Sequence, residues 1–156
     1  MQIEIDPLSP VAIYQQIRDR VVEAIASGAL RGGDQLVSVR RLAIEFGVNV
    51  ATVSKAYDML RAESLIVTNH KSGSIVAHDP SDAIPTDAFA LDWERRAATL
   101  LAEAIDQGMT DTVVVERLTR ILDGFATSRA RAADDPLRAI DGSTNPAAHR
   151  QKDSDR

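Results

Sequence analysis

Residues 42–60 read LAIEFGVNVATVSKAYDML, and this stretch decides how the rest of the chain is interpreted. The first part presents a short apolar helix face made of Leu42, Ala43 and Phe46. Gly47 then supplies the left-handed conformation that often ends a helix. Asn49 is a good N-cap for a second helix, because its side chain can accept a hydrogen bond from the amide of Ala51 or Thr52. The apolar side of that second helix comprises Val53, Ala56, Tyr57 and Leu60. Two short helices joined by a tight glycine turn predict a helix-turn-helix.

The other face of the second helix is polar and cationic near its N-terminus. A recognition helix in a major groove offers its first turns to base edges, while lysine side chains and the helix N-terminus meet phosphates. Ser38 caps the preceding helix, and Arg40 in its first turn can reach a phosphate or a guanine edge. The predicted DNA contacts on the two helices are Ser38, Arg40, Arg41, Asn49, Val50, Ala51, Thr52, Ser54 and Lys55. The alternative is an ordinary helical hairpin with a solvated polar face, in which Arg40 is solvated or paired with a carboxylate.

A β-hairpin is predicted directly after these helices. Residues 65–68 are extended and apolar, residues 69–73 are polar with one glycine, and residues 74–77 return as a second strand. A hairpin in this place is the wing of a winged helix-turn-helix, and its tip can lie against the minor groove or the backbone. His70 and Lys71 are the predicted contacts at the tip, although His70 taken alone is equally a solvent-exposed loop residue.

The segment before the helix-turn-helix predicts a scaffold helix. Ser9 followed by Pro10 is a favourable helix start, and the apolar residues Ile13, Ile17, Val21 and Ile25 recur at four-residue spacing. Gly28 ends this helix. Residues 1–6 alternate as an edge strand or as an arm packed on the domain, and residues 35–37 form a short strand at most.

The formal net charge of -5 over 156 residues argues against a nucleic-acid partner, because phosphate binding usually leaves a basic footprint. The distribution of charge weakens this objection. From residue 40 to residue 71, five basic residues stand against three acidic residues, a local balance of +2. The chain has no cysteine, which excludes disulfides and cysteine-ligated metal sites, and no apolar run of membrane-spanning length. We expect a soluble, cytoplasmic protein that uses no cofactor and no metal.

The second half of the chain predicts a helical dimerisation segment. Residues 79–86, with Pro80 and Pro85, form a linker, and Asp87 then caps a helix that Gly108 terminates. A second helix starts at Thr110 or Asp111. The apolar positions expected at the dimer seam are Leu91, Leu101, Ile105, Val114, Leu118, Ile121, Leu122 and Phe125. A hairpin of this size is too small to bury a core of its own, so a second copy would complete it. An effector pocket is the less favoured alternative, because no cluster of histidines and carboxylates marks the segment.

The predicted organisation is mainly α with a small β-hairpin. Residues 1–78 form an N-terminal winged helix-turn-helix DNA-binding domain, residues 79–86 a linker, residues 87–132 a short two-helix C-terminal dimerisation segment, and residues 133–156 a disordered tail. The tail is assigned on its richness in Ala, Asp, Arg, Pro and Ser.

The order of these elements resembles the GntR family of bacterial transcription regulators, and within it the YtrA subfamily. The matching text is Ile13-Tyr14-x-Gln16-Ile17, Gly28-x-Leu30, Gly33-Asp34-x-Leu36, Ser38-x-Arg40-x-Leu42-Ala43, Val48-Asn49-x-x-Thr52-Val53-x-Lys55-Ala56-Tyr57-x-x-Leu60 and Gly73-x-Ile75-Val76. The chain departs from the family pattern at Val37, at Val50-Ala51 and in the wing, where Lys71 replaces a glycine and Asn69-His70 a basic pair. These departures bear on base preference and wing contacts, since Val50 and Ala51 offer only apolar contact, for example to a thymine methyl.

The resemblance implies a homodimeric repressor that binds a palindromic operator in double-stranded DNA, in many relatives the operator of a membrane-transporter operon. It also implies a two-helix C-terminal segment used for dimerisation; a small-molecule effector is left open. The alternative, from another class, is a winged-helix protein-interaction module that does not bind DNA sequence-specifically. An enzyme is the least supported class, because the sequence offers no cysteine nucleophile and no glycine loop that would cradle a phosphate.

Overall fold

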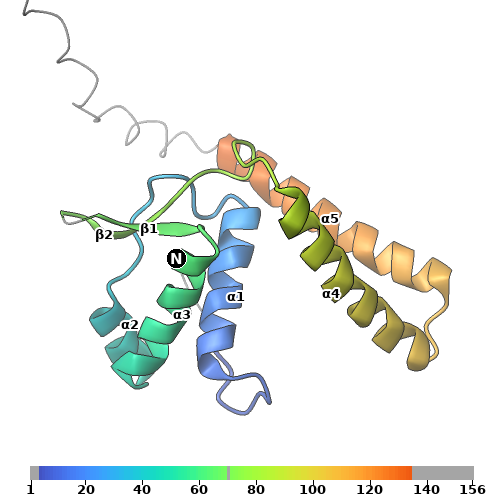
Figure 1. Cartoon of the computed structure of the whole chain (residues 1–156), viewed down its shortest axis with the longest axis horizontal. Coiled ribbons are helices and arrows are strands. Elements are labelled where there is room, and N and C mark those ends of the chain that lie inside the picture. The colour runs from blue at the N-terminus through green and yellow to red at the C-terminus, as the bar shows by residue number, and fades with distance from the viewer. Residues whose placement is uncertain (1–3, 70, 135–156) are drawn as a thin grey trace, which may run out of the picture.

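The computed structural model describes residues 4–69 and 71–134 (Figure 1). Along the chain it contains α1 (Ile13–Ala26), α2 (Val39–Phe46), α3 (Val50–Ala62), β1 (Ile66–Asn69), β2 (Gly73–Val76), α4 (Asp87–Asp106) and α5 (Asp111–Ala133). The two strands form one antiparallel hairpin that pairs Ile66 with Val76 and Asn69 with Gly73. The predicted fold class, a winged helix-turn-helix followed by two helices, is confirmed.

The core lies where α1, α2, α3 and the β-hairpin meet. The buried side of α3 is the one that the sequence predicts: Val53, Ala56, Tyr57 and Leu60 are all 0% exposed. They pack with Ile17 and Val21 of α1 and with residues of α2 and both strands. Burial of apolar surface contributes about 25 cal/mol of stabilising free energy per Å², and short helices are marginal by themselves. This shared core therefore holds the three helices together.

The helix-turn-helix forms through the local signals that predicted it. The Ser38 Oγ atom accepts a hydrogen bond from the Arg41 amide at 3.4 Å, which caps α2. Gly47 ends α2 in the left-handed conformation with φ of 63°. Asn49 then starts α3, because its Oδ1 atom accepts from the Ala51 amide at 2.8 Å.

The start of α1 differs from the prediction. The helix begins at Ile13, and Ser9 and Pro10 lie in a turn before it, so the predicted helix start at Ser9 is wrong. In that turn the Asp6 carboxylate accepts from the Leu8 amide at 2.9 Å, which competes with helix formation. The Gln16 side chain instead ties the turn to α1, with its Oε1 atom accepting from the Asp6 amide at 2.8 Å.

The flanking segments add little regular structure. Residues 4–6 form no strand, and Ile5 packs against the core, so the arm is the alternative that fits the described part of this segment. Gln35 makes one isolated bridge to Ile75 at the edge of the hairpin. At the wing tip, Asn69 Oδ1 accepts from the Lys71 amide at 2.9 Å. His70 lies outside the described residues.

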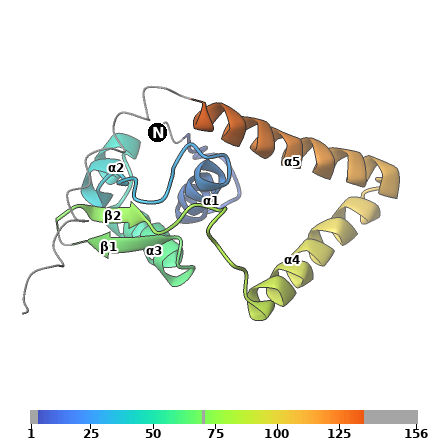
Figure 2. The same cartoon turned by 90° about the horizontal axis from the view of Figure 1, so that it is seen from above.

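Helices α4 and α5 form a splayed hairpin on the far side of α1 from α2 (Figure 2). Thr86, and not Asp87, caps α4, because the Thr86 hydroxyl accepts from the Phe89 amide at 3.2 Å. Asp87 is the first helical residue, where its negative charge interacts favourably with the positive end of the helix dipole. Thr110 caps α5. Neither helix buries a residue within the described chain, and no helix in these ranges is long and apolar enough to cross a membrane. From residue 135 on, the predicted tail lies outside the described residues.

A hydrogen bond from Tyr57 fixes α3 against the segment that precedes α2. The Tyr57 hydroxyl donates to the Val37 carbonyl at 2.6 Å, and burial raises the pKa of Tyr57 to about 12. In the unfolded chain the tyrosine pKa is about 10. The unfolded state therefore loses this proton first as pH rises, so the phenol destabilises the fold progressively from about pH 10 to about pH 12.

We expect Tyr57→Phe to lower the free energy of unfolding at pH 7 by about 1 kcal/mol, because the Val37 carbonyl loses its partner. The same variant should lose part of the alkaline destabilisation, a difference of up to about 2.5 kcal/mol by pH 12. Urea unfolding followed by circular dichroism at pH 7, 10 and 11 measures both effects. Parallel pH profiles for the two proteins would contradict the assigned role of the phenol.

Candidate nucleic-acid interface

The helix-turn-helix and the wing share one side of the molecule. In Figures 1 and 2, α2 and the β-hairpin lie on one side of α1, and α4 and α5 lie on the other. The C-terminal hairpin therefore leaves the N-terminal end of α3 uncovered. This is the arrangement that lets one helix enter a groove 12 Å wide while the wing contacts the neighbouring backbone.

Burial of one side of α3 turns the predicted contact residues outward. Ala51 and Lys55 are exposed, Val50 is 46% exposed, and Thr52 and Ser54 are half-buried on the flanks. The side-chain oxygen of Asn49 is occupied by its cap. The accessible start of α3 is thus short and mixed in polarity, with a methyl and an isopropyl group beside hydroxyl groups.

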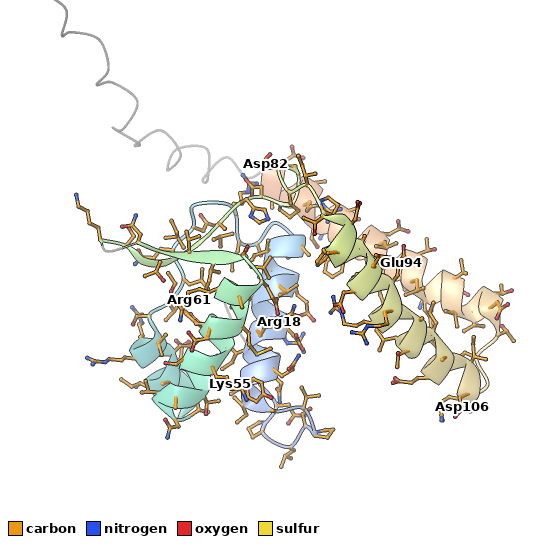
Figure 3. The ribbon with its side chains drawn as sticks, in the orientation of Figure 1. Arg18, Lys55, Arg61, Asp82, Glu94 and Asp106 are labelled. Carbon is orange, nitrogen blue, oxygen red and sulfur yellow. The ribbon has the colours of Figure 1, made fainter. Side chains whose placement is uncertain are left out.

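The cations around this surface have no carboxylate partner in the described chain, in contrast to three arginines of α1 and α3. Arg40, Arg41 and Lys71 are exposed, and within the described chain no carboxylate lies within 4.0 Å of their charged groups. Three other arginines of the N-terminal domain, on α1 and α3, are paired with carboxylates. Their pairs are Arg18 with Glu63 at 2.6 Å, Arg20 with Glu23 at 2.6 Å and Arg61 with Asp58 at 2.5 Å (Figure 3 labels Arg18 and Arg61).

Lys55 lies apart from the other cations. Its ammonium stands 3.7 Å from the centroid of the Tyr14 ring, on the flank of α3 that faces α1 (Figure 3). A cation–π contact of this kind contributes about 0.5 to 1 kcal/mol at an exposed site, so it orients Lys55 weakly. Sequence analysis did not predict this contact, because spacing within one helix gives no information about a residue on another helix.

Pairing changes the local charge that a phosphate backbone would meet. Of the eight charged residues from Arg40 to Lys71, Asp58 and Arg61 cancel, and Glu63 is bound by Arg18. The four cations Arg40, Arg41, Lys55 and Lys71 then face Glu45 alone, a balance of +3. A surface with few net charges binds DNA modestly and with a strong dependence on salt.

The Arg18 ion pair holds α1 to the end of α3. Burial by itself lowers the pKa of Arg18, but hydrogen bonds to Glu63 and Asp19 outweigh it and hold the pKa above its ordinary value. The guanidinium contacts both Glu63 oxygens, with its Nε atom 3.1 Å from Oε1 and 3.0 Å from Oε2. Such bidentate geometry is directional, and it keeps the frame under the recognition surface rigid.

Other candidate sites are less developed. No group of three or more His, Asp or Glu side chains suited to a metal ion occurs in the part of the chain that the structure describes. A cleft of about 610 Å³ separates α1 and the end of α3 from α4, lined partly by Val22, Phe89 and Trp93. Its charged residues pair with one another or with near neighbours, Arg18 with Glu63 and Arg96 with Asp92 at 3.0 Å. Trp93 is 55% exposed there and packs in no core.

Comparisons with known proteins agree with this geometry. The profile described as bacterial regulatory proteins, gntR family, matches residues 13–76. The chain is 40% identical over 77 residues to the HTH-type transcriptional repressor YtrA of Bacillus subtilis, a match that spans 49% of this chain and 59% of that protein. YtrA from Sulfolobus acidocaldarius, a GntR-family transcription factor of known structure, is 36% identical with a TM-score of 0.51, covering 67% of this chain and 97% of that one. A transcriptional antiterminator from Listeria monocytogenes EGD-e shares the fold, with a TM-score of 0.71 and 24% identity over 78% of this chain and 93% of that one.

We expect Arg40→Ala to weaken DNA binding by about 1 to 3 kcal/mol, because it removes an exposed, unpaired guanidinium from the first turn of α2. Stability should be unchanged, since the side chain is exposed and unpaired within the described chain. Arg20→Ala is the matched control, because it removes an exposed arginine of α1 whose partner is Glu23 on the same helix. Equal loss of affinity in both variants, measured by fluorescence anisotropy, would reduce the role of Arg40 to bulk charge.

Proposed function

The chain belongs to the GntR family of bacterial transcription regulators and has YtrA-like relatives, and we propose that it acts as a dimeric repressor of a palindromic DNA operator. Those relatives are named as transcription regulators, so the chain is a DNA-binding regulator and not an enzyme. The matched part spans 59% of the length of Bacillus subtilis YtrA. The operator and the genes that the protein regulates are therefore part of the proposal.

The observation that carries the proposal is the group of unpaired cations around an open recognition helix. Arg40 and Arg41 at the start of α2 and Lys71 at the wing tip lack carboxylate partners within the described chain, while the arginines behind α3 have them. Unpaired, exposed cations are free to replace the counterions of a phosphate backbone.

Each part of the surface then has a role in the complex. Helix α3 enters the major groove, with Thr52 and Ser54 near base edges and Val50 and Ala51 against thymine methyl groups. Arg40, Arg41 and Lys55 contact phosphates or, for Arg40, a guanine edge. Ser38 and Asn49 act through their caps, which orient the amides of the first turns toward the DNA. The wing carries Lys71 to the outer backbone, and His70 belongs to the same predicted tip.

Fluorescence anisotropy with duplexes tiled from the DNA upstream of the gene tests this proposal. We expect one duplex to bind at least about 1,000-fold more tightly than a scrambled duplex, with affinity falling steeply as salt rises. The mapped site should contain two inverted half-sites about one helical turn, roughly 34 Å, apart. Equal binding to every duplex, or no binding at low salt, would favour the protein-interaction module instead.

The second half of the proposal is a dimer built through α4 and α5. Both helices lack a buried residue in the described chain, yet they carry large apolar side chains. Exposed fractions at the predicted seam are 68% for Leu91, 36% for Leu101, 56% for Ile105, 46% for Leu118, 56% for Ile121 and 65% for Leu122, with Val114 and Phe125 half-buried. Large apolar side chains left exposed on a two-helix unit call for a partner, and a second copy supplies matching ones.

We expect Leu118→Asp to convert the dimer to monomer, because a carboxylate in an apolar seam would lose its hydration. Operator affinity should then fall by about 100-fold through lost bivalency. Thr119→Asp is the control, since it adds the same charge at an exposed polar neighbour on α5. Sedimentation velocity reports the assembly state, and a Leu118→Asp protein that remains dimeric would place the seam elsewhere.

A further inference from the structure

The loop that follows α1 contacts both the linker that leads to α4 and the end of α5. We call residues 27–34 the docking loop. In the linker, eight residues before α4, Asp79 Oδ1 accepts a hydrogen bond from the Gly32 amide at 3.0 Å. At the end of the hairpin, the Arg31 guanidinium donates to the carbonyl of Ala132 in the last turn of α5. Figure 2 shows this last turn above the end of α1. The DNA-binding domain is thus tied to the end of α5 and to the linker that leads to α4.

Two arginines make the tie reciprocal. Arg129 of α5 donates from Nη1 to the Ala26 carbonyl, the last residue of α1, at 2.7 Å. Arg31, just after α1, donates to Ala132 at the end of α5. The last carbonyls of a helix have no partner inside it and carry partial negative charge, so a guanidinium is a well-matched donor. Arg129 of α5 therefore satisfies a terminal carbonyl of α1, and Arg31 of the docking loop satisfies a terminal carbonyl of α5.

Two glycines allow the docking loop to approach α5 and the linker closely. Gly28 has φ of +73°, and a Cβ atom built there would lie 3.4 Å from Ala132 Cβ and 3.5 Å from Arg129 Cα. At Gly32, a Cβ atom would lie 3.1 Å from the Asp79 nitrogen and 3.1 Å from the His78 carbonyl carbon. The backbone of the docking loop itself is the contact surface for the last turn of α5 and for the start of the linker.

Elsewhere along its length the hairpin has no buried residue, as described above. Few contacts other than these terminal ones therefore define the angle between the hairpin and α3. In a dimer that assembles through the hairpin, this angle decides where each recognition helix points. Adding one base pair between half-sites turns one of them by about 35° and shifts it by about 3.4 Å, so a rigid pair of domains fits one spacing.

We propose that Arg31 and Arg129 are positioning residues that fix each DNA-binding domain on the α4–α5 hairpin and thereby select the spacing between operator half-sites. This inference rests on the proposed function, a dimer that binds an inverted repeat. The two arginines touch no DNA. They act by keeping α3 at one angle to the α4–α5 hairpin. Both recognition helices then reach their grooves without the entropic cost of ordering the two domains.

A spacer series tests the proposal directly. The duplexes carry the same two half-sites, with the spacing changed one base pair at a time. We expect the wild-type dimer to bind one spacing at least about tenfold more tightly than its neighbours, because only that spacing permits bivalent binding. The double variant Arg31→Ala/Arg129→Ala should bind its best duplex about tenfold more weakly and discriminate less than about threefold between spacings. Its circular dichroism and dimeric sedimentation should match those of the wild type.

Two further variants separate positioning from charge. Arg120→Ala removes a guanidinium from the same helix, but that side chain pairs with Glu116 within α5 at 2.7 Å, so the sharp preference should persist. Arg31→Ala/Arg129→Lys keeps the charge and one donor at position 129, and it should restore part of the preference that the double alanine variant loses. A double variant that keeps the wild-type spacing profile would overturn the proposal.

A measurement without DNA keeps this test independent of the proposed function. The chain has no cysteine, so dyes can be attached at Ala62→Cys on α3 and Gln107→Cys at the turn of the hairpin. Labelled protein is mixed with excess unlabelled protein, so that each dimer carries one labelled chain. We expect a narrow distance distribution in the wild type and a broad one in the double variant. Identical distributions would sink the positioning role, whereas wild-type protein that binds no duplex would sink the proposed function alone.

Discussion

The hydrogen bond from Tyr57 to the Val37 carbonyl is the constraint on which the DNA-binding surface depends. The ring is buried at the centre of the core, and its one polar atom is satisfied by the segment that leads into α2. Because Ser38 follows directly and caps α2, the bond relates the start of α2 to the middle of α3. Rotation of α3 about its axis would break this bond and bury Ala51 or Lys55, so the face offered to DNA is defined from inside the domain.

The pairing of charges decides which surface of the domain keeps a positive charge. The chain is acidic overall, with a net charge of -5, and a surface average would argue against DNA. The carboxylates Glu23, Asp58 and Glu63 each bind an arginine of the N-terminal domain. What remains around the open end of α3 is a small set of cations without such partners in the described chain. Local pairing, and not composition, therefore determines which surface of this domain is attractive to a polyanion.

Much of the fold could be predicted because its signals are local. Ser38, Gly47 and Asn49 act on amides or dihedral angles within three residues, and the buried side of α3 follows from helical spacing. The helix start predicted at Ser9 was wrong, since hydrogen bonds between Asp6 and Gln16, ten residues apart, define that turn. The Lys55–Tyr14 contact and the Arg129–Ala26 hydrogen bond join elements that are distant in sequence, so the spacing of residues within a helix cannot predict them. The assignment of individual DNA contacts and the domain limits stay predictions.

The unburied faces of α4 and α5 have a consequence for dosage. In the proposed assembly the hairpin gains its core only when two chains meet, so the amount of folded regulator depends on how much protein the cell contains. Below the dissociation constant of the dimer, occupancy of an operator would rise with the square of the chain concentration. A modest change in expression would then switch the target gene more sharply than a monomeric repressor allows, without a bound metabolite.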